Sequence, residues 1–331
     1  MLDQLTRHQI WVERYGNNIV KNEIIPILVS MREEIAFKLI NATSFQIARQ
    51  SQLLKEIDQI ISGAVDKIRP SLFESMQELG EYETTWSTKL LDDNTIASVT
   101  IGAGLEPAII TGILQNNKMF LSPDSKGHTI DQLITKFGKA ISKDVKSLIT
   151  TGLTAGDTTD VIARNMVALS KTRTIDQARA VVLTVANHVG NEARADTWAE
   201  YDDLFEGMEY VATLDSRTTI LCASRDGNVY PFNKKPHLPA HYRCRSVYVP
   251  KIKEEYALIK DGTRASANGQ VKASMNYSDW LKTQSKTIQN EVLGVKRAEL
   301  FRSGELTLDK FVSKNGDVYT LDELKQRDLL K

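Results

Sequence analysis

Apolar residues recur at three- and four-residue steps between Met31 and Leu79. This spacing places them along one face of a helix, so roughly the first 90 residues are predicted to be helical. The apolar stripe could bind a partner helix or form a coiled coil. Its heptad is not strict, however, which favours helices that pack on their own core. The stripe consists of Ile35, Leu39, Leu53, Leu54, Ile57, Ile60, Ile61, Val65, Ile68, Phe73, Met76 and Leu79.

Local signals divide this helical part of the chain. Pro70 is expected to end or kink its helix, because proline lacks the amide hydrogen and crowds the preceding turn. The segment from Asn41 to Ser44 is a candidate cap for the second long helix. Gly102 and Gly104 form a weak phosphate-loop signal, but no third glycine follows at the required spacing, so a turn is favoured.

The helical pattern continues further along the chain with one marked break. Gly152 is expected to close the helix that ends near Leu148, because glycine is the preferred residue just after a helix. Asp157 or Thr158 can then cap the next helix. Another helix is predicted over Ile175–Tyr201.

The pattern changes after Gly207. Alternating residues predict a strand over Met208–Leu214, and a second strand over Ser246–Pro250 should be stopped by its proline. Between them, Asp226-Gly227-Asn228 is a strong turn signal. The sequence therefore predicts an α+β fold, mostly helical, with a small β-containing module near residues 207–250 that a bound metal would stabilise.

Composition narrows the function classes. The chain has 331 residues, 42 basic and 42 acidic, and 41% are hydrophobic. A net charge of zero excludes nucleic-acid binding through general basicity and leaves only a local patch. No apolar run is long enough for a membrane span, and the start of the chain lacks the apolar core of a secretion signal. Two cysteines cannot build a disulfide framework, so we expect a reducing compartment.

Both cysteines lie in the part of the chain richest in candidate chemistry. Cys222, His237, His241 and Cys244 are the thiol and imidazole groups that hold Zn²⁺ in a tetrahedron. The spacing His241-x-x-Cys244 lets two ligands converge from one tight turn. Four candidates so close in the sequence would complete the shell, which favours a structural zinc over a catalytic one.

The alternative interpretation is that these residues pack in the core and bind no metal. Cysteine is often a small buried hydrophobe, and the spacing matches no standard zinc finger. The fourth ligand stays open among His237, Asp226 and Asp215.

Catalytic interpretations of the same segment are weaker. Asp215, Arg217, Asp226 and His241 could form a metal-dependent nuclease or hydrolase site, but such sets are common by chance. Cys222 and His241 could form a nucleophile–base pair, although no flanking sequence supports it.

Two arginines, Arg243 and Arg245, flank Cys244. Guanidinium groups in this position could contact a phosphate. Exposed ion pairs with nearby carboxylates are the more ordinary outcome, and we expect those.

The motif around these residues resembles the Mu F-like head morphogenesis family, the minor head proteins of tailed bacteriophages. The resemblance lies in Thr213-Leu-Asp-Ser-Arg-Thr218, in Cys222 and Asp226-Gly227, and then in Leu238-Pro-Ala-His-Tyr-Arg-Cys-Arg245. The segment around Gly152 and the tail after Tyr277 are similar to the family as well. The resemblance covers roughly residues 140 to 331.

The resemblance implies a minor capsid protein of low copy number, inside the head near the portal, that aids head assembly and DNA packaging or ejection. The implied partners are the portal protein, the major capsid protein and packaged phage DNA, with no membrane. The implied location is the virion, and the host cytoplasm during assembly. We expect no enzymatic activity. The alternative is a phage-carried enzyme, either a metal-dependent nuclease or an ADP-ribosyltransferase-like effector.

Three regions follow from pattern and resemblance together. Residues 1–130 form a helical N-terminal region, and residues 131–250 form the Mu F-like head morphogenesis domain. Residues 251–331 form a linker and a helical C-terminal extension. Within the last region, the polar stretch Lys260–Lys272 is expected to be an exposed loop or linker.

Overall fold

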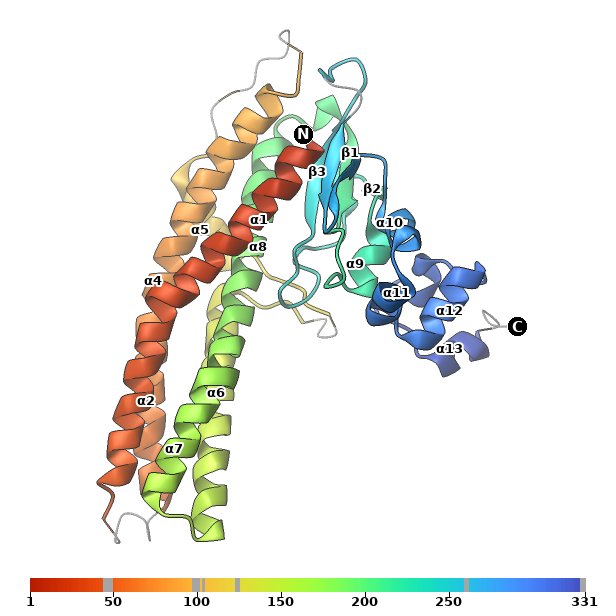
Figure 1. Ribbon diagram of the computed structural model, residues 1–331. Helices are drawn as coiled ribbons and strands as arrows, with labels where there is room; N and C mark the ends of the chain where they lie inside the picture. Colours follow the sequence, from red (N-terminus) through yellow and green to blue (C-terminus); the bar gives the residue numbers. More distant parts are fainter. Residues whose placement is uncertain (44–49, 97–101, 103–104, 123–125, 259–261, 328–331) are drawn as a thin grey trace.

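The computed structural model describes residues 1–331 except 44–49, 97–101, 103–104, 123–125, 259–261 and 328–331. In the segment Asn41–Ser44, which is expected to cap a helix start, Asn41 instead lies at the C-terminal end of α2 (Ile25–Ile40), and Ser44 lies outside the described residues. The second glycine of the Gly102–Gly104 turn lies outside them as well. The molecule has a long helical bundle on one side, with a small sheet against one end of it and a group of short helices beyond the sheet (Figure 1).

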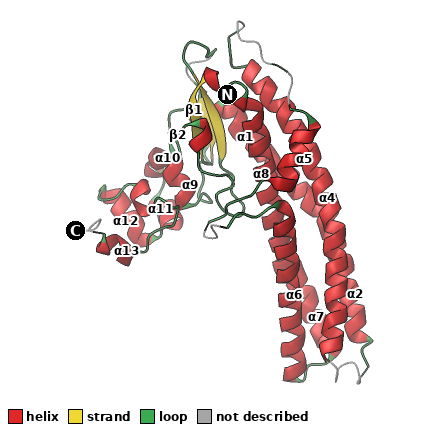
Figure 2. Ribbon diagram, turned by 180° about the vertical axis from the view of Figure 1, so that it is seen from behind, coloured by secondary structure: helices red, strands yellow, loops and turns green. Residues whose placement is uncertain are grey.

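Long helices form the bundle, and Figure 2 shows the same arrangement from behind. They are α1 (Leu2–Ile19), α2 (Ile25–Ile40), α4 (Gln50–Asp92), α5 (Pro107–Asn116), α6 (Ile130–Ala155), α7 (Thr159–Leu169) and α8 (Ile175–Ala199). No helix in the described part of the chain combines the length and apolar character needed to cross a bilayer.

The apolar stripe of the N-terminal region faces the interior of the bundle. Ile35 and Ile57 are fully buried in one hydrophobic core with Ile149 of α6 and Val185 of α8. Burial of this kind is the main driving force for folding. The prediction that these helices pack on their own core is confirmed, and the core continues across the predicted boundary at residue 130.

The structure places no helix end at Pro70 or at Gly152. The helix α4 continues through Pro70, whose ring lies on the exposed face, so the carbonyl that loses its amide partner can be hydrated. Gly152 does not close α6. It lies inside the helix, where a Cβ atom would come within 2.6 Å of the side chain of Ile162. The helix ends instead at Gly156, which has a φ of 80°. The prediction for the next helix is confirmed, because Thr158 caps α7.

The β-containing module has three antiparallel strands in the order β2-β1-β3. They are β1 (Phe205–Val211), β2 (Val229–Tyr230) and β3 (Val247–Ile252). The predicted turn is confirmed at Gly227, which has a φ of 81°. Pro250 does not stop its strand, because β3 is at the edge of the sheet, where a missing amide is tolerated. The α+β, mostly helical fold class is confirmed.

The region after the sheet is more ordered than expected. The predicted linker contains a hairpin of β4 (Thr263–Ser266) and β5 (Gly269–Lys272). Most of it is exposed, but the side chain of Arg264 is only 1% exposed. Short helices then pack around the buried Trp280 and Phe311. They are α10 (Tyr277–Thr283), α11 (Lys286–Leu293), α12 (Val295–Ser303) and α13 (Leu321–Gln326).

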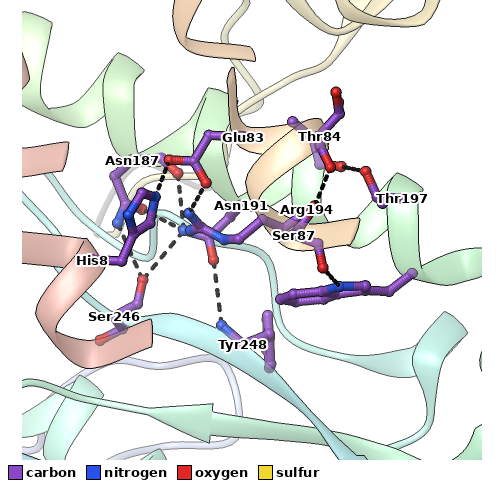
Figure 3. Close-up of polar contacts among 12 residues, drawn as sticks. His8, Glu83, Thr84, Ser87, Asn187, Asn191, Arg194, Thr197, Ser246 and Tyr248 are labelled. Atoms are coloured by element: carbon purple, nitrogen blue, oxygen red, sulfur yellow. Dashed lines mark hydrogen bonds and ion pairs between the residues drawn. The ribbon is translucent and has the colours of Figure 1, made fainter. Parts of the chain in front are cut away.

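A buried ionic group joins three helices of the bundle (Figure 3). The carboxylate of Glu83 on α4 is fully buried and accepts a hydrogen bond of 2.6 Å from the guanidinium of Arg194 on α8. Its other oxygen lies 2.7 Å from Nε2 of His8 on α1. A buried carboxylate without such partners would be strongly unfavourable. The pairing therefore fixes how α1, α4 and α8 align.

Two asparagines on α8 extend this polar group to the sheet (Figure 3). The amide of Asn187 donates to the carbonyl of Ser246 at 3.2 Å, and the side-chain oxygen of Asn191 accepts from the amide of Tyr248 at 3.3 Å. These bonds satisfy backbone groups at the start of β3, so the sheet is held in register against the bundle.

The helix α8 also carries a histidine that must stay neutral. His188 is 1% exposed, and burial lowers its pKa from 6.5 to about 4. The unfolded chain therefore takes up a proton at a higher pH than the native protein does. The free energy of unfolding should fall by about 3 kcal/mol as the pH decreases from about 6.5 to about 4.

Urea unfolding of the wild type and of His188→Gln across this pH range tests the prediction. The difference in unfolding free energy between the two should depend on pH, with the variant losing less stability on acidification. Parallel pH profiles would contradict a neutral buried imidazole at this position.

Candidate metal centre

Cys222 is positioned by the first turn of the short helix α9 (Ile220–Arg225). The hydroxyl of Thr219 caps this helix by accepting the amide hydrogen of Cys222. The cap turns the Cys222 side chain inward, where it is 2% exposed and packs in the core beneath the sheet.

His241 and Cys244 come from a tight turn on the opposite side. The amide of Cys244 donates to the carbonyl of His241 at 3.1 Å. Arg243 closes the turn with a φ of 59°, and it is the one non-glycine residue with positive φ in the described part of the chain. This conformation costs roughly 1–2 kcal/mol. A 2.9 Å bond from the Arg243 amide to the hydroxyl of Thr184 on α8 holds it in place.

The two segments bring two sulfurs and an imidazole together. The Sγ atoms of Cys222 and Cys244 are 3.8 Å apart, and Sγ of Cys222 is 3.2 Å from Nε2 of His241. All three ligand atoms lie within 4.8 Å of one another. Two thiolates bound to one zinc ion at the tetrahedral angle are about 3.8 Å apart. The group could therefore hold a metal ion with little movement.

The imidazole is oriented for such a role. Nδ1 of His241 lies 2.8 Å from the carbonyl oxygen of Tyr242, so with the proton on Nδ1 the ring donates to that carbonyl. Nε2 then keeps its lone pair and faces Cys222 and the hydroxyl of Thr219. A hydrogen bond on the far nitrogen is the usual way in which a metal-binding histidine is oriented.

The surrounding groups favour a thiolate at Cys222. Hydrogen bonds, first from Cys244 and then from His241, lower the pKa of Cys222 well below its usual value. Burial raises the pKa of Cys244, which acts as the neutral partner in the metal-free protein. Burial opposes protonation of His241, but the hydrogen bond and charge of Cys222, together with the hydrogen bond to the Tyr242 carbonyl, outweigh it and raise the pKa of the imidazole.

The other predicted ligands lie outside this group. The ring of His237 packs against Phe120, with ring centroids 4.5 Å apart. Asp226 is buried in an ion pair with Arg264, and Asp215 forms a bidentate pair with Arg245 at 2.6 and 2.7 Å. Among the residues that the structure describes, the group therefore has three protein ligands, not the four that a closed shell requires.

The arginines beside Cys244 form ion pairs, as predicted. Arg243 pairs with Asp176 at 2.6 Å on an exposed surface. The pair of Arg245 with Asp215 is largely buried, which the sequence did not indicate.

Some residues that support the site carried no signal in the sequence. The hydroxyl of the fully buried Tyr210 donates to Sγ of Cys222 at 3.2 Å. Arg264 binds both oxygens of Asp226, which also accepts the amide hydrogens of Ala212 and Tyr277. The polar stretch around Arg264 gave no reason to expect a buried charge. The alternation of the first strand did at least place Tyr210 on one face.

The arrangement suits metal binding better than covalent catalysis. A reactive cysteine needs exposure to its substrate, and Cys222 is almost completely buried behind His241 and Tyr210. With three protein ligands, a bound ion would keep one coordination position for a water molecule.

Comparison with known proteins agrees with the motif. Residues 143–249 match the family model described as Phage Mu protein F like protein. This segment is about a third of the chain, and it contains α8, β1, β2, the first half of β3 and all three residues of the metal-binding group. The match confirms the resemblance there and does not include the tail after Tyr277. Neither the curated proteins nor the solved structures contain a significant match.

A substitution at Asp226 tests whether this carboxylate stabilises the fold or binds the metal. Asp226→Ala would leave Arg264 buried without its counter-charge, so the free energy of unfolding should fall by about 3–5 kcal/mol. Metal content per folded molecule should stay the same, because the carboxylate is not in the Cys222–His241–Cys244 group. Urea unfolding and elemental analysis measure the two quantities.

The matched control is Asp279→Ala, which removes an exposed carboxylate paired with Lys282 on the surface. It should change stability by less than about 1 kcal/mol. Metal loss in folded Asp226→Ala would show that this carboxylate is a ligand after all.

Proposed function

We propose that this protein is a minor component of the head of a tailed bacteriophage, present in few copies inside the capsid near the portal. The match of residues 143–249 to the phage Mu protein F like family is the observation that carries the proposal. The matched segment contains the whole metal-binding group, so the proposed function and the candidate site belong to the same part of the chain.

The proposed role of the metal is structural. Cys222, His241 and Cys244 would hold a zinc ion, whose chemistry when bound is to keep both thiols ionised and tied together. The chain's own residues would then link α9 to the turn before β3. Both segments already contribute to one apolar core, which includes Leu221, Ala240 and the two cysteines, and the link would add to the stability of that core.

A role without catalysis fits the residues around the metal-binding group. A metal-activated water would need an acid or base beside it, and the carboxylates nearest in the sequence are Asp215 and Asp226. Both are held in buried or half-buried ion pairs with arginines. For this reason we favour assembly over nuclease or transferase activity.

Contacts with the portal or coat protein would use the outer faces of the bundle. The apolar stripe is buried in the core of the bundle, so it is not available to bind a partner. Phe37 and Ile40, at the end of α2, are 71% and 51% exposed and offer an apolar contact instead. Packaged DNA is a further proposed partner, and the protein would pass through the host cytoplasm before assembly into the virion.

The metal proposal predicts one zinc ion per chain in the purified full-length protein. Cys222→Ser and Cys244→Ser should each lose the ion and lower the melting temperature, because the link between α9 and the turn is broken. Elemental analysis and thermal unfolding with and without a chelator are the measurements.

His237→Ala is the matched control, since its imidazole lies against Phe120 and outside the group. It should keep its zinc. A wild-type protein without zinc after refolding in zinc-containing buffer would contradict the proposal, and loss of zinc in His237→Ala would add that residue as the fourth ligand.

The head proposal predicts that this chain is found in particles of the phage whose genome encodes it. Quantitative mass spectrometry of purified particles should give a few copies per particle, far below the major capsid protein. Particles emptied of DNA would show whether the protein leaves with the genome. Its absence from both mature and precursor particles would overturn the proposal.

A further inference from the structure

A cavity of about 590 Å³ lies between α1, α8 and the loops that carry the metal-binding group. Its walls include His241 and Cys244, so it borders that group from the solvent side. Most charged residues in its lining are basic. They are Arg179, Arg217, Arg243 and Arg245, against the single carboxylate of Glu13.

The cavity still has an excess of basic groups when the carboxylates that pair with its arginines are counted. Asp176 and Asp215 pair with Arg243 and Arg245, so the arginines still outnumber the acids, four to three. In a chain of zero net charge, this is a local basic patch of the kind that anion binding requires.

Two of these arginines have capacity for a ligand. Arg179 is half-buried on α8 and has no ion pair or hydrogen bond within the described residues. The guanidinium of Arg217 is 65% exposed and makes only long contacts, 3.3 Å to Glu13 and 3.6 Å to Asp215. Such contacts contribute little and can be exchanged for a better acceptor.

An uncharged residue that lines the same cavity is evidence for a ligand that does not depend on the arginines. Gln9 on α1 is 6% exposed and lines the cavity, yet its buried Oε1 atom has no hydrogen-bond partner. Buried amides without partners are rare in native proteins. The NH₂ group of the same amide also has no hydrogen-bond partner within the described residues and, unlike Oε1, is not fully shielded, so it can donate to an acceptor in the cavity.

We propose that this cavity binds a phosphate group through Arg179, Arg217 and the amide of Gln9. Planar guanidinium groups suit phosphate oxygens, and they bind them with charge-assisted hydrogen bonds. The phosphate can belong to a nucleic-acid backbone or to a small phosphate compound. The site depends neither on the metal nor on the role in the head, because none of its three donors is in the Cys222–His241–Cys244 group.

Titration of the full-length protein tests the site. The probes are a fluorescently labelled short single-stranded DNA, its duplex, inorganic phosphate and pyrophosphate, followed by anisotropy or calorimetry. Arg179→Gln and Arg217→Gln should each weaken binding by about tenfold, because a charge-assisted hydrogen bond is lost. Arg179→Lys should recover part of the affinity, since it restores the charge without the fork.

The salt dependence separates a ligand contact from a structural effect. If the phosphate belongs to DNA, Arg179→Gln should reduce the slope of log affinity against log salt by about 0.7–0.9. The matched control is Arg164→Gln, which removes an exposed arginine of α7 far from the cavity in the fold and should leave affinity and slope unchanged.

Each outcome decides the proposal. Binding of DNA with competition by inorganic phosphate assigns the site to a nucleic-acid backbone. Binding of phosphate or pyrophosphate without DNA assigns it to a small phosphate compound. If no probe binds, or if both cavity variants bind as Arg164→Gln does, the cavity is not a phosphate site. Arg217 lies on an exposed loop, so its variant stays folded and keeps the test valid if Arg179→Gln is unstable.

Discussion

The fold depends on one fully buried carboxylate, Glu83, and on the two groups that hydrogen-bond to it. Arg194 and His8 come from different helices, so the three helices can align only where all three side chains meet. A break in this group would leave an unpaired charge in a low-dielectric core, which costs far more than the pairing contributes. The ionic group therefore acts mainly on specificity: it selects one alignment among the many that apolar stripes alone would allow.

The alignment of α8 in turn positions the metal-binding group. The same helix that carries Arg194 holds the start of β3 through Asn187 and Asn191, and it holds the strained turn at Arg243 through Thr184. Asp226 and Arg264 form a second buried ion pair, which fixes the loop after α9. The two buried ion pairs, Glu83 with Arg194 and Asp226 with Arg264, thus hold the segments that carry Cys222 and His241.

The sequence predicted the parts of this structure that local pattern controls. The periodicity of apolar residues predicted the helices, and the clustering of Cys222, His241 and Cys244 predicted the group that could hold a metal. It could not predict which polar residues are buried. Arg264 lies in a polar, glycine-containing stretch that is typical of an exposed loop. Its charge is buried because it pairs with the carboxylate of Asp226, which is far away in the sequence. For the same reason Asp215 and Asp226 were open as metal ligands until their arginine partners were known.

The matched segment, residues 143–249, does not contain all that its own structure requires. Arg194 lies inside it, but the carboxylate that neutralises Arg194 is Glu83, and the partner of Asp226 is Arg264. Both partners lie outside, one on each side. A chain limited to the matched segment would bury an unpaired arginine and an unpaired aspartate, and it would expose the face of α8 that packs on α4 and α1. The flanking regions are therefore part of the folding unit, and changes within them act on the metal-binding group through these two ion pairs.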